Sequence, residues 1–395
     1  MKSTMNGLPT PDSDALTLSN ELTQYIRRRI QRHGNPSFAN FMQMALYTPS
    51  LGYYANGLPK IGAGGDFTTA PEISPIFSKC LANQAWQVLN QMNDGHILEF
   101  GAGRGTMAKD ILLHLADHAD QFNHYYILEV SAALRAQQTE TLSSLPEKLR
   151  NKVIWLDQLP KQPFNGVILA NEVLDAMPVE RIRLEPDQQL QAFVSWDDAQ
   201  QHFSWAYQPI TDTRLQKIAN RLQQAIGEPP IRGYHAEINL NIQPWLRSLD
   251  ELLNQGMLLL IDYGYPRKEL WQPARYMGTL RCHYQQRAHN NPFWHPGLQD
   301  ITAHVDFTAV AEAAYAAHFK VAGYTTQAHF LMGTGLLEFS LQQDQDVVVQ
   351  LQLSQQIKRL TLPDEMGESF KVMALTKQFD SPLIGFQQRD LRHQL

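Results

Sequence analysis

Cysteine is scarce in this 395-residue chain, which contains only Cys80 and Cys282. The two residues lie far apart and in no metal-type spacing, which excludes a disulfide framework and a zinc knuckle. Reduced thiols in a reducing compartment are the simplest interpretation. The sequence also shows no Ser-His-Asp pattern and no metal-ligand constellation, so we predict no metal site.

A surplus of positive charge is absent as well, because the formal net charge is -6. Sequence-independent nucleic-acid binding needs a basic surface, so we expect no nucleic-acid partner. The acidic surplus weakly favours a basic protein or peptide partner. No stretch approaches about 18 uninterrupted apolar residues, so we expect no membrane span.

The first 17 residues lack the basic start and apolar core of a secretory signal. They contain Asp12 and Asp14 but no arginine, unlike a mitochondrial presequence. We therefore expect a cytoplasmic location in a bacterium. The oligomeric state is left open, and a homodimer is compatible with the sequence.

Apolar runs alternate with helical patterns through much of the chain. Strands are expected at 96–100, 125–130, 153–156, 166–170 and 257–261, with helices between them. This alternation predicts an α/β fold with a doubly wound, mostly parallel sheet. Short antiparallel strands between residues 178 and 207 interrupt it, which indicates an inserted α+β subdomain facing the substrate.

We divide the chain by these patterns into six segments. They are a disordered N-terminus (1–16), N-terminal helices with a lid loop (17–75), a first core part (76–178), the insertion (179–254), a second core part (255–378) and a C-terminal tail (379–395).

A buried strand ending in Glu99 runs into closely spaced glycines at Gly101, Gly103 and Gly105. Glycines let a backbone turn sharply and approach a ligand, which lies outside the carboxyl ends of the strands. A dinucleotide motif would place its third glycine one residue later. An acid before the glycines suits a cation, and S-adenosylmethionine carries a sulfonium and an ammonium. A methyltransferase is therefore favoured over a nucleotide oxidoreductase or a structural turn.

Two acids follow the next strands. Glu129 comes at the interval where an acid grips ribose hydroxyls in open α/β sheets, although a solvated strand-end acid is the alternative. Asp157 follows the third strand and is a candidate for the adenine amino group. It fits an ordinary turn equally well.

Asn171, Glu172 and Asp175 lie at the end of the fourth strand. A protonated arginine acceptor could be held bidentately there by a carboxylate. Glu172 is the first candidate and Asp175 the second, while Asn171 is a candidate for the cofactor or the acceptor. The alternative is a helix start, with Asn171 as its cap and acids in its first turn.

Two loops supply further candidates. Asp66 and Thr68 lie in a glycine-rich loop that could fold over the cofactor as a lid, although Thr69 and Pro71 also fit a plain helix start. His304 could accept a proton during the reaction. A structural histidine is the alternative.

Six motifs in order resemble the MidA-like proteins, which include the mitochondrial complex I assembly-factor arginine methyltransferase. They are GDFTTAPE (65–72), EFGAGRG (99–105), NEVLDAMP (171–178), DYGY (262–265), DITAHVDF (300–307) and MGESFKV (366–372). The resemblance implies a class I methyltransferase fold with a substrate insertion and S-adenosyl-L-methionine as cofactor, leaving S-adenosyl-L-homocysteine. It also implies symmetric dimethylation of a protein arginine, with a respiratory complex subunit as the acceptor of the eukaryotic member.

Two other functions stay open at this point. One is an assembly chaperone that keeps the cofactor pocket but acts by binding. The other is a methyltransferase of small molecules, which the large insertion disfavours.

Overall fold

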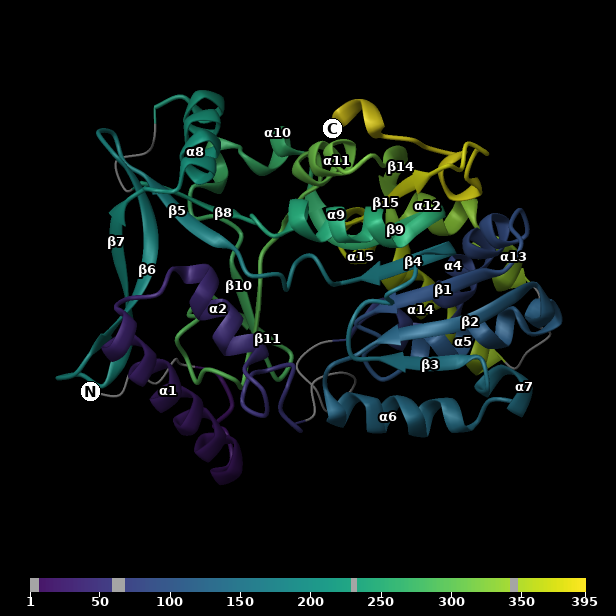
Figure 1. Cartoon of the computed structure of the whole chain (residues 1–395), viewed down its shortest axis with the longest axis horizontal. Helices are drawn as coiled ribbons and strands as arrows, with labels where there is room; N and C mark the ends of the chain where they lie inside the picture. Colours follow the sequence, from purple (N-terminus) through teal and green to yellow (C-terminus); the bar gives the residue numbers. More distant parts are fainter. Residues whose placement is uncertain (1–6, 59–67, 229–232, 342–346) are drawn as a thin grey trace. The chain divides into compact units, whose positions relative to one another are not determined.

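The computed structural model describes residues 7–58, 68–228, 233–341 and 347–395 (Figure 1). The chain divides into two compact units, each assembled from separate segments. The core unit comprises Thr68–Leu174, Ile242–Pro266 and Val305–Leu395, and the accessory unit comprises Met1–Phe67, Asp175–Asn241 and Arg267–His304.

The core unit is built on one sheet in the order β14-β15-β9-β4-β1-β2-β3, with β13 paired to β9. Strands β1, β2, β3, β4 and β9 run parallel, and β15 is antiparallel to both β9 and β14. The bounds are β1 Gly95–Phe100, β2 Phe122–Leu128, β3 Val153–Leu156, β4 Phe164–Asn171, β9 Leu253–Tyr265, β13 Val305–Asp306, β14 Lys320–Thr326 and β15 Phe370–Lys377.

Helices cover this sheet. They are α3 Ala70–Ile73, α4 Pro75–Leu89, α5 Thr106–His114, η1 Ala116–Gln121, α6 Ala132–Ser143, α7 Glu147–Arg150, α9 Ile242–Leu252, α11 Phe307–Ala316, α12 Gln327–Gly333, α13 Leu336–Leu341, α14 Val347–Thr361, α15 Met366–Ser369, η3 Ile384–Phe386 and η4 Arg392–Gln394. Ile97 of β1 joins the hydrophobic cluster formed with α4 and α5. Phe100, three residues on and therefore on the opposite face, contacts Trp245 of α9 at 5.5 Å between ring centroids. Both faces of β1 are thus covered, as in an α/β protein.

The accessory unit contains two smaller antiparallel sheets, in the orders β7-β6-β5-β8 and β11-β10-β12. Its strands are β5 Glu180–Leu184, β6 Gln189–Asp197, β7 His202–Pro209, β8 Tyr234–Ile238, β10 Arg281–Tyr284, β11 Arg287–His289 and β12 Asp300–Thr302. Its helices are α1 Ser13–His33, α2 Phe38–Tyr47, α8 Thr213–Ile226, α10 Arg267–Leu270 and η2 Pro273–Arg275. Strands β5, β6 and β7 lie where the sequence predicts short antiparallel strands, whereas β8 is a strand that the sequence analysis does not predict.

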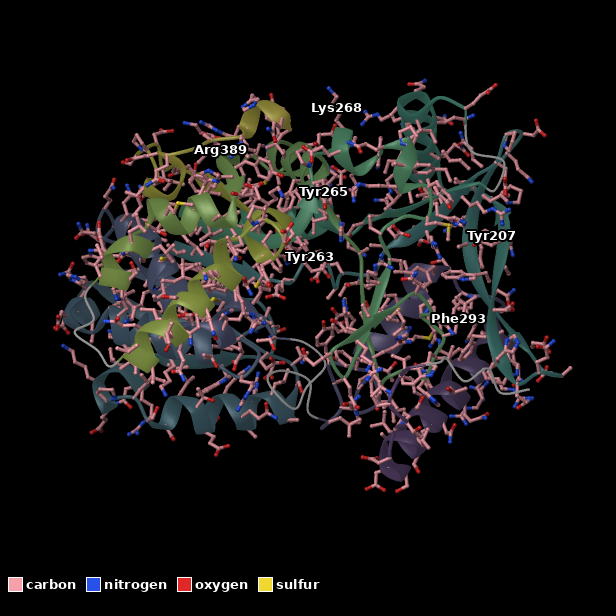
Figure 2. All side chains as sticks on the ribbon, turned by 180° about the vertical axis from the view of Figure 1, so that it is seen from behind. Tyr207, Tyr263, Tyr265, Lys268, Phe293 and Arg389 are labelled. Atoms are coloured by element: carbon pink, nitrogen blue, oxygen red, sulfur yellow. The ribbon has the colours of Figure 1, made fainter. Side chains whose placement is uncertain are left out.

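Aromatic packing joins the N-terminal helices to the larger sheet of the accessory unit. Phe38 of α2 contacts Trp205 of β7 at 4.9 Å between ring centroids. Tyr207, labelled in Figure 2, lies next to Trp205 on the same face of β7. The N-terminal helices are therefore part of this unit's hydrophobic core.

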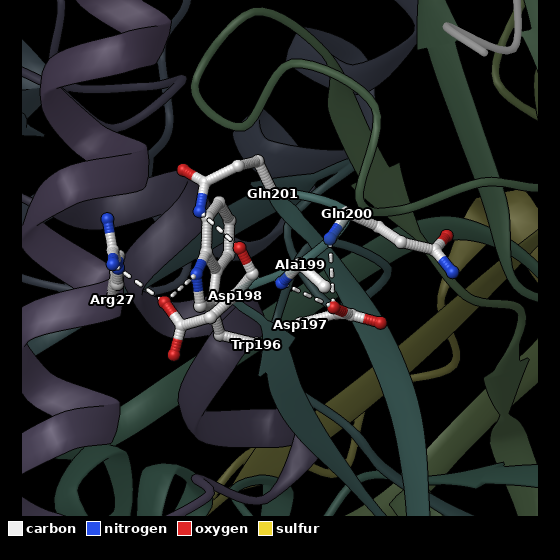
Figure 3. A network of polar contacts seen from close by, with 7 residues as sticks. All are labelled: Arg27, Trp196, Asp197, Asp198, Ala199, Gln200 and Gln201. Carbon is white, nitrogen blue, oxygen red and sulfur yellow. Dashed lines mark hydrogen bonds and ion pairs between the residues drawn. The ribbon is translucent and has the colours of Figure 1, made fainter.

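A polar network ties α1 to the turn between β6 and β7 (Figure 3). Arg27 forms an ion pair of 2.7 Å with Asp198 and lies over the ring of Trp196. The neighbouring Asp197 accepts hydrogen bonds from two backbone N–H groups of the same turn. The turn is thus held by its own carboxylate and by the helix.

The compact units divide the chain differently from the sequence-based segments, since Arg267–His304, predicted within the second core part, belongs to the accessory unit. The predicted insertion ends at residue 254, but α9 belongs to the core unit because Leu246 and Leu249 are buried and the helix packs on α11 and β9. The first helix begins at Ser13, inside the predicted disordered segment, because Asp12 caps it by accepting a bond from the Ala15 amide. The predicted tail, 379–395, buries Phe379, Leu383, Phe386 and Leu391.

Two further properties concern only the part of the chain that the structure describes. None of its helices is long and apolar enough to cross a membrane. Nor does it bring together three or more His, Cys, Asp or Glu side chains in a group that could hold a metal ion.

Candidate cofactor and acceptor site

The order of the strands places the predicted site at a reversal in the sheet. From β1 the chain proceeds outward to β2 and β3, and β4 then starts the other half of the sheet on the opposite side of β1. The glycine loop follows β1 and Asn171 ends β4, so the two features flank the topological switch point. Open α/β sheets bind ligands there.

The glycine loop follows β1 directly. Gly101, Gly103 and Gly105 have φ values of 62°, 54° and 83°, a region that side chains rarely adopt. A Cβ atom at Gly105 would also lie 3.3 Å from the Cα atom of Gln138 in α6. The loop therefore needs glycine both for its conformation and for the close approach of α6.

Glu99 lies inside the core unit, with 1% of its surface exposed. Its Oε2 accepts a hydrogen bond of 2.6 Å from the Tyr125 hydroxyl, which lies on the neighbouring strand β2. Burial raises the pKa of Glu99 to about 7, against the opposing effect of the Tyr125 bond. A buried carboxyl poised between its two charge states suits a cationic ligand group.

Glu129 comes immediately after β2 and is also buried. Its Oε1 accepts a 2.8 Å bond from the Ser131 amide, and its Oε2 accepts a 3.1 Å bond from the side-chain amide of Gln138. Burial raises the pKa of Glu129, and these bonds to its charged form work against that rise. Both oxygens are thereby fixed in place with lone pairs left for further donors.

Asp157 lies after β3 and points into solvent, since 86% of its side chain is exposed. It forms a 2.7 Å ion pair with Arg135 of α6. Arg135 also donates to the carbonyl oxygen of Glu129. The loops after β2 and β3 are therefore tied together by one guanidinium.

The end of β4 has an unusual backbone. Glu172 has a φ of 53°, a left-handed conformation that costs a residue with a side chain roughly 1–2 kcal/mol. Its amide donates to the carbonyl of Ile261 in β9, and its Oε1 accepts a 3.1 Å bond from the Asn171 side chain. Such strain often marks functional positions.

The sequence-based alternative for this segment, a helix capped by Asn171, is wrong. Residues 172–179 are all described and contain no helix, because the chain turns there into the accessory unit. Instead of capping, Asn171 is buried and its Oδ1 has no hydrogen-bond partner in the structure. A buried acceptor of this kind is ready for a donor from a ligand.

Asp262 holds the turn after β4 and is a residue that the sequence-based list of candidates lacks. It is fully buried in β9. Its Oδ2 accepts a 2.9 Å bond from the Leu174 amide, and its Oδ1 accepts one from the Tyr263 amide. Tyr263 and Tyr265 follow it on the strand and are labelled in Figure 2. Asp262 therefore supports the segment that carries Glu172.

Asp175 and His304 belong to the accessory unit, whereas Glu99, the glycine loop, Glu129, Asp157, Asn171 and Glu172 belong to the core unit. Asp175 is buried, and its carbonyl accepts a 3.1 Å bond from the amide of Ala303, the neighbour of His304. The amide of His304 itself donates to the Thr279 hydroxyl at 3.2 Å. The backbones carrying Asp175 and His304 are thus adjacent within this unit.

A partly buried tyrosine also contacts this segment. The hydroxyl of Tyr47 donates to the carbonyl of Ala176 at 3.0 Å. Burial raises the pKa of Tyr47, and the carboxylates of Asp300 and Asp175 raise it further. The carbonyl groups of two successive residues, Asp175 and Ala176, are therefore both hydrogen-bonded.

The predicted lid is only partly described. Asp66 lies outside the described residues, and Thr68 is half-buried just before α3. Thr69 occupies the N-cap position of α3 without a side-chain capping bond. Glu72, in the first turn of α3, accepts a hydrogen bond from the Thr106 hydroxyl and lies 3.8 Å from Arg104. The start of α3 is thus tied to the glycine loop.

The structure adds Tyr125, Arg135, Gln138 and Asp262 to the candidates from the sequence. Each of these side chains bonds to a partner on another element or far along the chain. No local sequence motif therefore marks these four residues. The resemblance to a known family includes the DYGY segment and could have pointed to Asp262. Nothing comparable marks Gln138.

The residues at the carboxyl edge fit S-adenosylmethionine. Gly101, Gly103 and Gly105 keep side chains away from the strand ends, two buried carboxyls stand at Glu99 and Glu129, and the Oδ1 of Asn171 lacks a partner. Glu99 would hold the ammonium, and Glu129 would accept the ribose hydroxyls.

Comparisons with known proteins agree with this geometry. Residues 80–325 match the model of a protein family described as "Putative S-adenosyl-L-methionine-dependent methyltransferase". The chain is 27% identical to the mitochondrial protein arginine methyltransferase NDUFAF7 homolog of Drosophila melanogaster, over 96% of this chain and 91% of that protein. The Xenopus laevis NDUFAF7 is also 27% identical, over 91% of this chain and 85% of its own length.

A solved structure shows the same fold with a ligand. The crystal structure of a Burkholderia thailandensis protein bound to S-adenosyl-homocysteine is 38% identical, covers 98% of this chain and 100% of its own, and has a TM-score of 0.92. A native crystal structure from the same organism, also 38% identical with the same coverage, has a TM-score of 0.89. The fold and the cofactor expected from the glycine loop are confirmed, and the chain belongs to this family of S-adenosyl-L-methionine-dependent methyltransferases.

Proposed function

We propose that this methyltransferase acts on arginine side chains of a protein and adds two methyl groups symmetrically. The carboxyl group of Glu172 carries the proposal, because it follows β4 in a left-handed turn beside the switch point of the sheet. The relatives named protein arginine methyltransferases support it.

An arginine acceptor explains why a carboxylate is needed at this position. A guanidinium is protonated at neutral pH, and a carboxylate can hold two of its N–H groups and direct the third nitrogen. The Asn171 side chain, 3.1 Å from Glu172 Oε1, would orient that carboxylate. Asp175, three residues later, is the second candidate for binding the acceptor.

S-adenosylmethionine, when bound, supplies an electrophilic methyl group whose departure leaves the neutral thioether S-adenosylhomocysteine. The acceptor nitrogen forms the new N–C bond, and one proton leaves the guanidinium so that its charge stays +1. We propose His304 as the acceptor of that proton, because histidine titrates near neutrality. Holding nitrogen and methyl in line is the main contribution of such a site.

The finer assignments for the cofactor are also proposals. Asp66 and Thr68 would close over it, and Asp157 would meet the adenine amino group. Asp157 is exposed and paired with Arg135, so it could accept a further bond without losing a buried partner.

For the acceptor we propose a subunit of a respiratory complex I-type enzyme, on the strength of the family resemblance. In the sequence, the four-stranded sheet β7-β6-β5-β8 is inserted between two segments of the core unit. An insertion of this size favours a large acceptor over a small molecule. We also propose a cytoplasmic location, supported by the two free, buried thiols of Cys80 and Cys282.

The decisive experiment is labelled methyl transfer into the proteome of a strain that lacks this gene. We expect labelled symmetric dimethylarginine in one or a few proteins with the unmodified enzyme, and none with Glu172→Gln. Normal cofactor binding without label in any protein would contradict the proposal. Glu172→Gln also separates a chaperone from an enzyme, since a binding role would survive this change in a complementation assay.

A further inference from the structure

Gln138 is a polar residue in an apolar position. It lies in the middle of α6 with none of its surface exposed, and α6 packs against the glycine loop. A buried side-chain amide costs free energy unless its donors and acceptor are bonded. The contacts of Gln138 show where those bonds go.

The amide nitrogen of Gln138 bonds two different parts of the cofactor site. Nε2 donates to the carbonyl of Gly103 at 2.9 Å and to Glu129 Oε2 at 3.1 Å. One side chain thus links the glycine loop after β1 to the acid after β2. Each of its two N–H groups serves one of them.

The amide oxygen of Gln138 is fixed from the other side. Trp155 of β3 donates its indole N–H to Oε1 at 2.9 Å. The indole N–H of Trp155 can only donate. The carbonyl oxygen of Gly103 can only accept, and so can an ionised Glu129 carboxylate. A single orientation of the Gln138 amide therefore satisfies all three bonds. Gln138 therefore links the loop after β1 and the acid after β2 to strand β3.

Packing reinforces these bonds. A Cβ atom at Gly105 would meet the Cα, Cβ and Cγ atoms of Gln138 at 3.3–3.5 Å, so the loop rests directly on this side chain. The second oxygen of Glu129 is held by the Ser131 amide at 2.8 Å. Both ends of the link are thus fixed, and Gln138 sets the distance between them.

We propose that Gln138 is a positioning residue for the methyl donor: it fixes the glycine loop and Glu129 at the separation that the cofactor's ribose requires. Trp155 acts with it by holding the amide in its one productive orientation. The inference rests on the proposed roles of the glycine loop and Glu129.

The test measures the dissociation constant of S-adenosylhomocysteine by calorimetry, with unfolding by denaturant in parallel. Gln138→Met keeps the length of the side chain and removes all three bonds. We expect it to weaken binding roughly tenfold or more, since two bonds toward the site are lost. The KM for S-adenosylmethionine should rise while kcat at saturation changes little, because the loss is one of uniform binding.

Gln84→Met is the matched control. Gln84 is a fully buried glutamine of α4 in the same unit, bonded to Gln87 and to the amide of Gly385. This variant should lose a similar amount of stability and keep the wild-type dissociation constant. An equal effect of both variants on binding would overturn the positioning role.

Two further variants keep the result interpretable. Trp155→Phe removes only the donor that orients the Gln138 amide, so it should weaken binding less than Gln138→Met does. If Gln138→Met does not fold, Trp155→Phe takes its place in the test. Glu129→Ala tests the site itself. If Glu129→Ala still binds S-adenosylhomocysteine normally, the proposed cofactor site is wrong. If Glu129→Ala binds weakly but Gln138→Met and Trp155→Phe keep wild-type affinity, only the proposed role of Gln138 is wrong.

Discussion

The Tyr125 hydroxyl donates to Glu99 Oε2 across 2.6 Å between two neighbouring parallel strands, and both side chains are buried. The tyrosine stabilises the charged form of a carboxyl that burial drives toward its neutral form. The Tyr125 bond therefore favours the charged form of Glu99, against burial and the nearby carboxylate of Glu129, which favour the neutral form.

If Glu99 binds the ligand's ammonium, as we propose, the affinity for S-adenosylhomocysteine should increase as the pH rises from about 6 to about 8, since the pKa of Glu99 is about 7 and only its charged form attracts the ammonium. Tyr125→Phe should move this rise to higher pH, because it removes the bond that lowers the Glu99 pKa. Calorimetry across the pH range measures the shift. Glu99→Gln should flatten the profile, and an unchanged profile in that variant would exclude Glu99 as its source.

The raised pKa of Glu99 has the opposite consequence for the stability of the ligand-free protein, which it lowers as the pH rises. The folded chain binds the Glu99 proton more tightly than an unfolded chain, whose carboxyl has a pKa of 4.5. The contribution of Glu99 to stability therefore falls as the pH rises from about 4.5 to about 7. Denaturant unfolding should show a smaller fall in Glu99→Gln than in the unmodified protein.

Asp157→Ala tests the proposed adenine contact. The residue is exposed, so we expect its loss to change the unfolding free energy by no more than about 0.5 kcal/mol. If Asp157 accepts a bond from the adenine amino group, the variant should bind S-adenosylhomocysteine more weakly but bind the inosine analogue as the unmodified protein does. Equal weakening for the two ligands would point to the Arg135 ion pair instead.

Glu172→Gly separates strain from activity. Glycine adopts the φ of 53° without a clash, so the unfolding free energy should stay level or rise by about 1 kcal/mol, after the entropy that glycine costs. Methyl transfer should be abolished while cofactor binding persists. Gln378→Gly is the matched control, since Gln378 is an exposed left-handed residue after β15. Active Glu172→Gly enzyme would remove Glu172 from the reaction.

Asp262→Ala should destabilise the protein by roughly 3 kcal/mol, because two backbone amides lose a buried carboxyl acceptor. Chemical denaturation measures this loss. Asp306→Ala offers a comparison, since Asp306 caps α11 through one amide bond, worth about 1 kcal/mol. Similar losses in both variants would mean that Asp262 is no more than an ordinary capping residue.

Much of the sheet could be predicted from sequence because its strands are short apolar runs. The strand predicted at 153–156 coincides with β3, and the strand predicted at 257–261 lies within β9. By contrast, β10, β11 and β12 lie in a segment that reads as a polar and aromatic loop. Each has only three or four residues, too few for a period to emerge. Only Gln285 and Gln286 separate β10 from β11, whereas β12 pairs with β10 from beyond residues 290–299.

The candidate site divides in the same way. The positions of Glu99, Glu129 and Asn171 at the ends of strands could be predicted, because each follows or ends an apolar run. Gln138 and Tyr125 could not, since their roles depend on which atoms meet across different elements. The division into compact units could not be predicted from the sequence either. For example, α9 has the pattern of an ordinary amphipathic helix, which does not indicate the unit to which it belongs.

The position of β15 between β9 and β14 has a consequence for the making of the protein. All segments of the accessory unit have been synthesised once His304 has left the ribosome. By contrast, β14 can pair with its neighbour β15 only after residues 370–377 have been synthesised. The nascent chain therefore carries an incomplete methyltransferase sheet through most of its synthesis. A premature stop between residues 326 and 370 would leave β9 with an open edge, a site for aggregation.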